Sequence, residues 1–473
     1  MSRSKRPETD DEKKKKDNHS DTITAIVTPP GAGGLAAVRI AGSRSLSLLR
    51  RHFQPTARNS HPAPFLMRYG HFLDGNGEVI DEVTAVYMPR GRSYTGQDQV
   101  EIFCHGGRHL PKVILNELMA SGARAAEPGE FTKMAFLSGR IDLAHAEAVA
   151  EIIEANTDSS FQTAREHLLG AYTEHITMLR NQMIELISEI EASIDFPDED
   201  LDIKTTERIV KSVETVIAGV KSLVDSYTGG RIIREGYTVA IAGRPNAGKS
   251  SLFNLLLNQE RALVMPTAGT TRDYLTEWID LEGFAVKLVD TAGLRSGAGK
   301  IEKAGQESAM NIISGADLVI WMIDLNRKKW LSELKIDLKL LNKKANILAG
   351  NKIDIVPDYP KKIKTAKQID IAPISCLTGK GIDQLKKRLM ANIDARMPDL
   401  TSGITVTSAR HRQKLNSSLR SLRRTRLLIK AGETPEITAF ELRQAVNAID
   451  EITGKVHTED ILERIFSKFC VGK

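Results

Sequence analysis

The stretch "GRPNAGKSS" (243–251) follows the apolar run "YTVAIA" and precedes the helical run "SLFNLLL". A strand, then G-x-x-x-x-G-K-S, then a helix is the local context of a phosphate-binding P-loop. Gly243 and Gly248 allow the backbone to wrap phosphate oxygens, and the start of the helix adds its dipole. Lys249 is expected to reach the terminal phosphates and Ser250 to ligate magnesium. The stretch therefore predicts a nucleoside triphosphate site.

The runs that follow predict a doubly wound α/β domain from Tyr237 to about Arg396. Short apolar strands at 284–290, 317–324 and 345–352, and a further one from 370, alternate with helical stretches. That alternation is typical of a parallel sheet with helices on its faces.

The identity of the base is indicated by "NKID" (351–354), which ends one of these strands. Asp354 can accept paired hydrogen bonds from the ring N–H and amine of guanine, while Asn351 contacts the opposite edge and Lys352 packs along the base. Adenine lacks those donors, and a buried carboxylate left unpaired is costly. In "ISC", Ser375 and Cys376 follow the next strand and offer a backbone N–H to the guanine oxygen. After a P-loop, this order predicts GTP.

Two further segments complete the predicted phosphate site. "DTAG" (290–293) ends a strand, so that Asp290 fits a carboxylate behind magnesium and Gly293 can present its N–H to the γ-phosphate. "GTTRD" (269–273) lies where a switch loop is expected, and its Thr271 is the expected second magnesium ligand beside Ser250. The predicted GTP-binding set is Asn246, Ala247, Gly248, Lys249, Ser250, Ser251, Met265, Pro266, Thr267, Ala268, Gly269, Thr270, Thr271, Asp290, Thr291, Ala292, Gly293, Asn351, Lys352, Asp354, Ser375 and Cys376.

Leu294 follows the D-x-x-G segment, at the position where many regulatory GTPases carry a glutamine that orients water. Leucine can neither orient water nor neutralise charge, so other groups are required. Asn246, with carbonyls of "MPTAGT" (265–270), can cage a monovalent cation beside the phosphates. Glu302 can reach a water, but the residues alone favour a surface charge on a helix.

The composition is that of an ordinary globular protein: 473 residues, with 41% hydrophobic and 27% charged. This length predicts about three domains at roughly 150 residues each. No apolar run approaches the roughly 18 residues of a membrane span. Residues 1–20 are highly charged and lack the apolar core of a secretory signal, so we expect a disordered leader. Three cysteines are too few for a disulfide framework, and a cytoplasmic location is expected.

The net charge of +6 permits a polyanionic partner without demonstrating one. Basic residues are concentrated in one predicted helix, "SARHRQKLNSSLRSLRRTRLLIK" (408–430). A solvated helix face and an RNA-facing surface both remain open for it.

The sequence before and after the α/β region shows three further patterns. Residues 21–124 read as strands and turns, with a hairpin closed at Asp74-Gly-Asn-Gly. Long helices begin after Pro128, and apolar residues at spacings of three and four from Ile176 to Ile190 predict one buried helix face. The last 75 or so residues are again helical, which suggests a helical domain interrupted by the α/β domain.

The chain ends in "FCVGK" (469–473), which places Cys470 three positions from the terminus. A small buried hydrophobe is the simplest interpretation of this cysteine. A functional thiol is the alternative, and a reactive thiolate would need a cation such as Lys473 or Arg39 nearby. Cys104 and Cys376 are expected to be structural.

Taken in order, the motifs resemble those of the tRNA modification GTPase family (MnmE/TrmE), from Asp21 to Lys473. They are "TPPGAGGLAAVRI", "SYTGQDQVEIFCHGG", "PGEFTKMAFLSGRIDLAHAEA", "DFPDED", "GRPNAGKSSLFN", "AGTTRD", "DTAGLR" and "FCVGK". The resemblance implies a multidomain α/β plus α+β chain. A Ras-like P-loop GTPase domain is inserted in a helical domain and preceded by a β-rich folate-binding domain. The expected boundaries are 1–20 leader, 21–138 folate-binding and dimerisation domain, 139–236 helical, 237–396 GTPase, and 397–473 helical.

The resemblance also implies roles for individual residues. Potassium is expected at Asn246, Met265, Thr267 and Thr270, in a loop ordered when the α/β domains dimerise with GTP. Glu302 matches the family's water-orienting glutamate. Arg39, Glu101, Arg140 and Lys473 match positions that hold 5,10-methylene- or 5-formyl-tetrahydrofolate, since a carboxylate can pair with the pterin and cations with its anionic tail. Cys470 is then placed next to the one-carbon unit.

The implied function is a potassium- and magnesium-dependent GTPase that helps add a carboxymethylaminomethyl or aminomethyl group at C5 of the wobble uridine (U34) of certain tRNAs. The chain has no G-x-G-x-x-G fingerprint, so FAD is expected only on an MnmG-type partner, in a heterotetramer or larger complex with a homodimer of this chain. A GTPase switch in ribosome or ribonucleoprotein assembly is the alternative, although it would need no folate site. Three positions depart from the family pattern: Ala32 and Arg140 stand where arginine and lysine are common, and Cys376 where alanine is usual.

Overall fold

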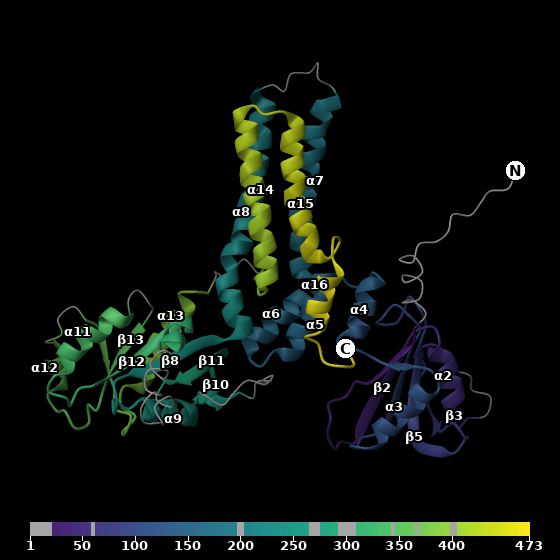
Figure 1. Cartoon of the computed structure of the whole chain (residues 1–473), viewed down its shortest axis with the longest axis horizontal. Helices are drawn as coiled ribbons and strands as arrows, with labels where there is room; N and C mark the ends of the chain where they lie inside the picture. The colour runs from purple at the N-terminus through teal and green to yellow at the C-terminus, as the bar shows by residue number, and fades with distance from the viewer. Residues whose placement is uncertain are drawn as a thin grey trace, which may run out of the picture. The chain divides into compact units, whose positions relative to one another are not determined.

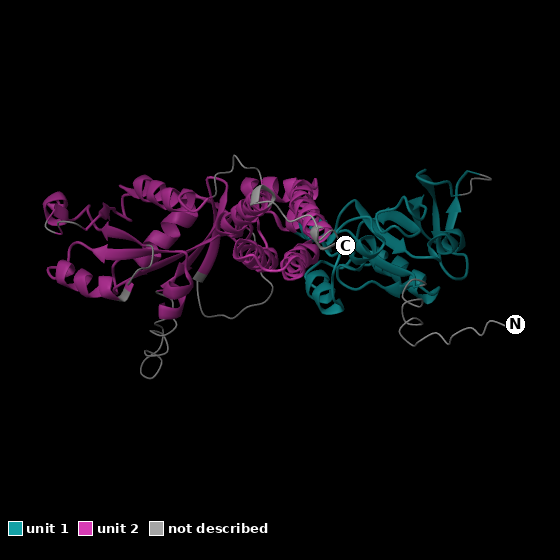
Figure 2. Ribbon diagram, turned by 90° about the horizontal axis from the view of Figure 1, so that it is seen from above, with its two compact units in different colours: residues 1–150, 453–473 teal, residues 151–452 magenta. Residues whose placement is uncertain are grey.

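The computed structural model describes residues 21–57, 62–195, 203–263, 275–291, 309–341, 346–364, 366, 369–397 and 404–473. These fall into two compact units (Figure 2): unit 1 is 1–150 with 453–473, and unit 2 is 151–452. The C-terminal segment is thus part of the same unit as the N-terminal sheet. Within the described ranges, no helix has the length and apolar character needed to cross a membrane.

Unit 1 is built on a seven-stranded sheet with the strand order β3-β4-β5-β6-β2-β1-β7. Its strands are β1 (Ile23–Ile26), β2 (Leu35–Ala41), β3 (Phe53–Pro55), β4 (Arg68–Leu73), β5 (Val79–Met88), β6 (Gln99–His105) and β7 (Arg124–Ala125). All neighbours are antiparallel except β7, which pairs with β1 in parallel. The hairpin predicted at Asp74 is confirmed: its N–H donates to the Glu78 carbonyl at 2.9 Å, and its carboxylate accepts from the Asn76 N–H.

Helices cover both faces of this sheet. α2 (Ser45–His52) and α3 (Leu110–Ala120) contribute Leu49 and Ile114 to a core with Val38 of β2. On the other face, Phe131 of α4 (Glu130–Leu137) packs against Ile23. α16 (Glu459–Phe466) and the part of α5 (Leu143–Glu154) in unit 1 pack together through a third apolar cluster. This packing brings the end of the chain to the β-sheet.

The helices of unit 2 come from both sides of the α/β region in the sequence. They are α6 (Asp158–Leu168), α7 (Ala171–Asp195), α8 (Ile203–Glu235), α14 (Ala409–Ala431) and α15 (Pro435–Thr453). The apolar face predicted for α7 is confirmed, since Ile176, Met183 and Ile190 are all buried. α14 lies along α8 (Figure 1), and Arg180 of α7 forms an ion pair with Asp450 of α15.

The basic segment 408–430 forms α14, and four of its eight Lys and Arg side chains form ion pairs with described residues. The ion pairs are Lys414–Glu451, Arg424–Glu441, Arg426–Glu214 and Lys430–Glu214. These contacts join α14 to α15 and α8, so they favour a structural role for the four side chains. Within the described residues, Arg423 is exposed and makes no ion pair.

The α/β part of unit 2 has a second seven-stranded sheet, ordered β14-β13-β12-β8-β11-β10-β9. Its strands are β8 (Tyr237–Gly243), β9 (Arg261–Ala262), β10 (Leu275–Leu281), β11 (Phe284–Asp290), β12 (Leu318–Asp324), β13 (Asn346–Asn351) and β14 (Ile371–Pro373); its helices are α9 (Lys249–Gln259), α11 (Trp330–Leu341), α12 (Tyr359–Lys364) and α13 (Ile382–Asp394). Strands β14, β13, β12, β8 and β11 are parallel, and β10 and β9 run antiparallel. The doubly wound arrangement is therefore confirmed.

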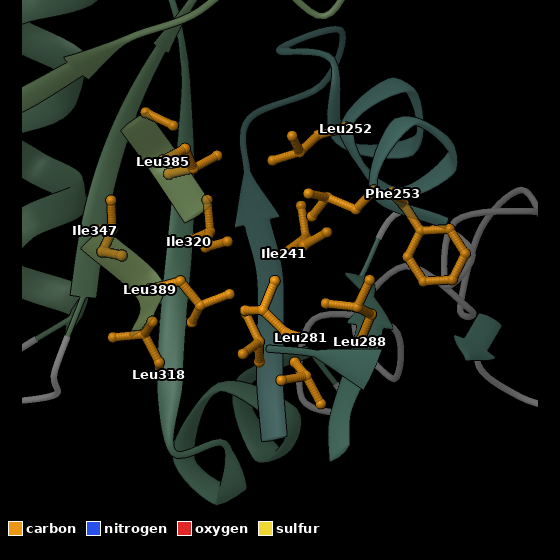
Figure 3. Packing of buried hydrophobic residues seen from close by; sticks show 14 of the residues in the cluster. Ile241, Leu252, Phe253, Leu281, Leu288, Leu318, Ile320, Ile347, Leu385 and Leu389 are labelled. Atoms are coloured by element: carbon orange, nitrogen blue, oxygen red, sulfur yellow. The ribbon is translucent and has the colours of Figure 1, made fainter. Parts of the chain in front are cut away.

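Figure 3 shows how this sheet is covered. Leu252 of α9 and Leu385 of α13 are buried against strand residues such as Ile241 and Ile320. Because the central strands are parallel, their carboxyl ends meet at one edge, where ligands of such sheets bind. The P-loop and the segments that begin at Asp290 and Asn351 all start at that edge.

Candidate functional site

The P-loop turns sharply between the end of β8 and the start of α9. Asn246 (φ 61°) and Gly248 (φ 99°) both have left-handed backbone conformations. A Cβ on Gly248 would lie 2.2 Å from Asn351 Nδ2, so this position has room only for glycine. Lys249 is buried, and its Nζ donates to the Arg244 carbonyl at 3.1 Å. The ammonium is thus held against the loop backbone.

The predicted magnesium ligand and the carboxylate behind it are in contact. Ser250 Oγ donates to Asp290 Oδ2 at 2.8 Å, and Asp290 is fully buried at the end of β11. Thr291, next to it, donates from Oγ1 to the Ile241 carbonyl at 3.0 Å. A hydroxyl beside a carboxylate is an oxygen donor set of the kind that Mg²⁺ prefers. These residues therefore fit the ion.

Asn351 connects the predicted base-binding segments to the P-loop. Its Nδ2 donates to the Ala247 carbonyl at 2.9 Å, and its Oδ1 accepts from the Cys376 N–H at 3.0 Å. Nearby, Ser375 Oγ donates to Asp354 Oδ1 at 2.6 Å. The P-loop, the segment of Asn351 and the segment of Cys376 are thus joined by hydrogen bonds, although up to 128 positions separate them in the sequence.

Two side chains at this site have clear electrostatic partners. Lys352, with φ 72°, places its Nζ 2.7 Å from Asp324 Oδ2 at the end of β12. Burial, with the nearby Asp354 charge, raises the pKa of the Cys376 thiol to about 11. Cys376 therefore remains a neutral thiol near pH 7, as expected of a residue whose contact is made by its backbone.

In unit 1, Arg39 and Glu101 face each other across β2 and β6. Arg39 donates from Nε to Glu101 Oε1 at 3.0 Å, and its Nη2 lies 2.8 Å from the same oxygen. The guanidinium also lies over the rings of Tyr94 and Phe131, with centroid distances of 5.8 and 5.4 Å. Such a half-buried, ring-flanked ion pair holds both polar groups in fixed positions.

The C-terminal tail reaches this pair. Arg39 Nη1 donates to the Gly472 carbonyl at 3.4 Å, and the Phe131 N–H donates to the Lys473 carbonyl at 3.1 Å. Upstream, Val471 pairs with Pro128 in an isolated bridge. The tail is therefore held by backbone contacts on both sides.

Comparison with known proteins identifies the family. Two family models match: "GTP-binding protein TrmE N-terminus" over residues 22–140 and "MnmE helical domain" over residues 143–470. The tRNA modification GTPase MnmE of Aquifex aeolicus is 38% identical over 456 residues, covering 95% of this chain and 99% of that protein. The protein of the same name from Carboxydothermus hydrogenoformans is 38% identical over 459 residues, covering 96% of this chain and 99% of that protein. The chain belongs to the MnmE family of tRNA modification GTPases.

Membership of the MnmE family confirms the resemblance carried by the motifs. Among solved structures, the G domain of the T. maritima FeoB iron transporter is 27% identical, covers 33% of this chain and 98% of that chain, and has a TM-score of 0.26. That score is too low to support a structural comparison.

Several residues singled out by the MnmE resemblance lie outside the described residues. They are Met265, Pro266, Thr267, Ala268, Gly269, Thr270, Thr271, Ala292, Gly293, Leu294 and Glu302. Of the predicted potassium ligands, Asn246 is described and is exposed on the P-loop. Ser251, a predicted GTP-binding residue, is exposed in the first turn of α9. The potassium site and the role of Glu302 therefore stay predictions.

Arg140 and the cysteines complete the set of predicted residues. Arg140 is exposed and donates from Nη1 to the Gly91 carbonyl at 3.3 Å; no contact among the described residues joins it to Arg39 or Glu101. Cys470 is exposed, whereas Cys104 is buried. Burial, with the charge of Asp81, raises the pKa of the Cys104 thiol to about 11, which suits a packing role.

One contact of the MnmE nucleotide site could not be found from motifs. Arg244, the second residue of the P-loop, pairs with Asp337 of α11 through Nε at 3.0 Å and Nη2 at 2.8 Å. Trp321 Nε1 donates to the same carboxylate at 3.3 Å. Arg244 can be found in the sequence because it follows Gly243 of the P-loop motif. Its partner Asp337 lies 93 residues away and belongs to no motif.

Proposed function

We propose that this MnmE-family chain is a potassium-dependent GTP hydrolase that helps modify C5 of the wobble uridine of tRNA. The added group is carboxymethylaminomethyl or aminomethyl, and its carbon comes from a tetrahydrofolate derivative, 5,10-methylene or 5-formyl. The observation that carries the folate part is the attachment of the C-terminal tail to Arg39, directly beside Glu101. A GTPase that acts only as a switch has no need for this arrangement.

The nucleotide part rests on the contacts at the edge of the second sheet. Ser250 and Thr271 would ligate magnesium, with Asp290 behind Ser250, and the ion supplies charge neutralisation at the phosphates when it is bound. Lys249 would contribute a second cation, and Asp354 would select guanine. We propose potassium at Asn246, Met265, Thr267 and Thr270, and water orientation by Glu302, on the family resemblance alone.

The folate part is supported by a hydrogen-bonding group that has no partner. Gln99 is buried and donates from Nε2 to Glu101 Oε1 at 3.1 Å, while its Oε1 has no hydrogen-bond partner among the described residues. A buried acceptor without a partner is uncommon, because its desolvation is not compensated. A pterin, which carries several N–H donors, has the chemistry to pair with Glu101 and Gln99. Arg39, Arg140 and Lys473 would face its anionic part.

We further propose a homodimer in the cytoplasm that acts with an FAD-binding partner in a heterotetramer or larger complex. The family resemblance supports this partner, since the chain lacks a dinucleotide-binding fingerprint. A GTPase switch in ribosome or ribonucleoprotein assembly is the alternative, and both membership of the MnmE family and the proposed folate site favour tRNA modification over it.

Calorimetric titration of the purified protein with 5-formyltetrahydrofolate tests the proposal. We expect saturable binding, and we expect Glu101→Gln to weaken it by about tenfold to a hundredfold through loss of a charge-assisted bond. Glu78→Gln, an exposed carboxylate in the same unit, is the matched control and should bind normally. A protein that hydrolyses GTP but binds no folate would favour the assembly switch instead.

A further inference from the structure

A groove of about 930 Å³ opens in unit 1 beside the C-terminal tail. Residues 28–33 with Leu35 and Ala36 of β2 line one part, Gly106, Gly107 and the start of α3 line another, and Cys470 and Val471 line a third. No acidic side chain is among the described residues that line it. The volume is at the upper end of what small-molecule pockets show. The groove is not part of the GTP site described above.

Two cations line this groove without an ionic partner. Arg108 and Lys112 are both exposed, and neither makes an ion pair with any described residue. They flank the start of α3 at Leu110, whose first N–H groups add partial positive charge. Unpaired cations next to a groove without acids create a positive potential that attracts a polyanion.

Glycines form part of the lining of the groove: Gly31, Gly33, Gly106 and Gly107. The Gly106 N–H donates to the Gly34 carbonyl at 3.3 Å, and a Cβ on Gly106 would lie 2.3 Å from the Gly33 carbonyl oxygen. Residues 29–35 are exposed. At Gly31 and Gly107 an added Cβ would meet no atom within 4 Å, so these two positions leave open space in which a sugar–phosphate backbone can approach the protein backbone closely.

We propose that this groove binds a single-stranded segment of the RNA substrate, with phosphates at Arg108 and Lys112 and a base near Cys470. The proposal rests on the proposed function, because it takes tRNA as the substrate. It also gives the tail a physical role: Cys470 lines the groove, while the carbonyls of Gly472 and Lys473 are bonded at Arg39 and Phe131. Cys470 thus lines the RNA groove two positions before Gly472, whose carbonyl contacts Arg39 in the proposed folate site.

The test follows RNA binding to the full-length protein by fluorescence anisotropy. The probe is a labelled RNA hairpin with an anticodon-arm sequence and uridine at the wobble position. Arg108→Ala/Lys112→Ala should lower affinity about tenfold at roughly 0.15 M salt. The slope of log K against log salt should become shallower by about 1.4, because each lost contact to a single strand removes about 0.7. Ala32→Arg, which adds a cation to the groove wall, should tighten binding.

The matched control is Lys361→Ala/Lys364→Ala, which removes two exposed positive charges of α12 in unit 2. Its RNA affinity should stay near wild type. A second measurement follows alkylation of the cysteines by iodoacetamide and mass spectrometry. Bound RNA should slow the reaction of Cys470 severalfold and leave that of Cys376, in unit 2, unchanged.

Four results would overturn the groove assignment: no RNA binding by the wild type, full RNA affinity in the groove variant, equal loss in the control variant, or no protection of Cys470. If Arg108→Ala/Lys112→Ala weakens binding of a polyglutamylated folate but leaves RNA binding intact, the groove assignment is also overturned. The groove would then be assigned to the anionic folate tail. Wild-type protein that binds the RNA through the groove but binds no folate would retain the RNA proposal and reject the folate part of the proposed function.

Discussion

At the scale of single residues, Asn351 holds the nucleotide site together. Its side-chain amide donates to the P-loop at Ala247 and accepts from the backbone of Cys376. Because both halves of the amide are used, the base-binding segments and the phosphate-binding loop cannot move independently without breaking a buried hydrogen bond. Among the described residues, the Asp354 carboxylate accepts one side-chain hydrogen bond, from Ser375 Oγ, and it keeps acceptor capacity for a base.

Asp354→Asn should change the base preference from guanine to xanthine. The substitution exchanges an acceptor for a donor, which opposes the N–H groups of guanine but matches the carbonyl of xanthine. We expect GTP affinity to fall by about tenfold to a hundredfold, the range for one charged hydrogen bond. Competition binding of GTP and XTP measures it, with Asp358→Asn, an exposed neighbour, as control. Unchanged GTP preference would contradict the assignment of "NKID".

At the scale of elements, a buried carboxylate joins several segments of unit 2. Glu151 of α5 accepts from Thr407 Oγ1 at 2.8 Å and lies 3.1 Å from both His167 Nδ1 of α6 and Arg234 Nη1 of α8. Burial raises the pKa of Glu151, but the hydrogen bonds and charges of these partners outweigh it, so that the pKa lies below the ordinary 4.5. The charged carboxylate therefore stabilises the packing of these elements.

Glu151→Gln should lower the free energy of unfolding by about 2–4 kcal/mol at pH 7. A carboxylate whose folded-state pKa is depressed contributes stability above its ordinary pKa and loses it as pH falls through the folded value. The difference between wild type and variant should therefore shrink below about pH 4.5. Denaturant unfolding at a series of pH values measures it, and Glu154→Gln, exposed on the same helix, is the control. A pH-independent difference would argue against the ionic contribution.

The tail is a second element whose position can be tested. Deleting residues 470–473 removes the hydrogen bonds to Arg39 and Phe131 along with Lys473. We expect folate affinity to fall by about 1–3 kcal/mol while GTP hydrolysis persists, since the GTP site belongs to unit 2. Parallel titration and phosphate-release assays test this. Normal folate binding by the truncated protein would reduce the tail to an ordinary chain end.

Cys470→Ser separates the thiol from the rest of the tail. Because the backbone contacts of Gly472 and Lys473 remain, folate and GTP binding should stay near wild type. We expect lower tRNA modification in a reconstituted assay with the flavin partner. Cys104→Ser, at a buried position, is the comparison for general effects on folding. Full modification activity would assign Cys470 to packing alone.

At the scale of the whole molecule, each unit has apolar cores of its own, so that each can be described as a separate body. The proposed hydrolysis mechanism depends on assembly, since the potassium loop is expected to be ordered when two α/β domains meet. Asn246 is exposed on the P-loop, where an assembly partner and a cation can both reach it.

Hydrolysis should therefore be at least about tenfold faster in potassium than in sodium at equal ionic strength, as for gain of an arginine-finger equivalent. Asn246→Gly should remove this difference and retain nucleotide binding. Glycine is preferred to alanine here because φ is 61°, a conformation that strains a Cβ-bearing residue. Initial rates of phosphate release in the two salts provide the measurement. Equal rates for the wild type would reject a cation in place of the missing arginine.

The sequence by itself determined what depends on neighbours along the chain. The P-loop, the hairpin at Asp74, the apolar face of α7 and the alternation of strands and helices follow from local periodicity and turn chemistry, which act over a few residues. The same local patterns located the GTP-binding motifs at the ends of the predicted strands. The two matching family models then confirmed that the resemblance extends over residues 22–140 and 143–470.

Only the tertiary structure decided which distant residues meet. Arg39 joins Glu101 across 62 positions and Gly472 across 433, and Arg244 finds Asp337 across 93. No local propensity specifies such partners, because closing a long loop costs entropy that only the combined burial of a core offsets. The charges of α14 illustrate the same limit: their composition allowed an RNA surface, and packing against α8 and α15 placed four of the eight Lys and Arg side chains in ion pairs.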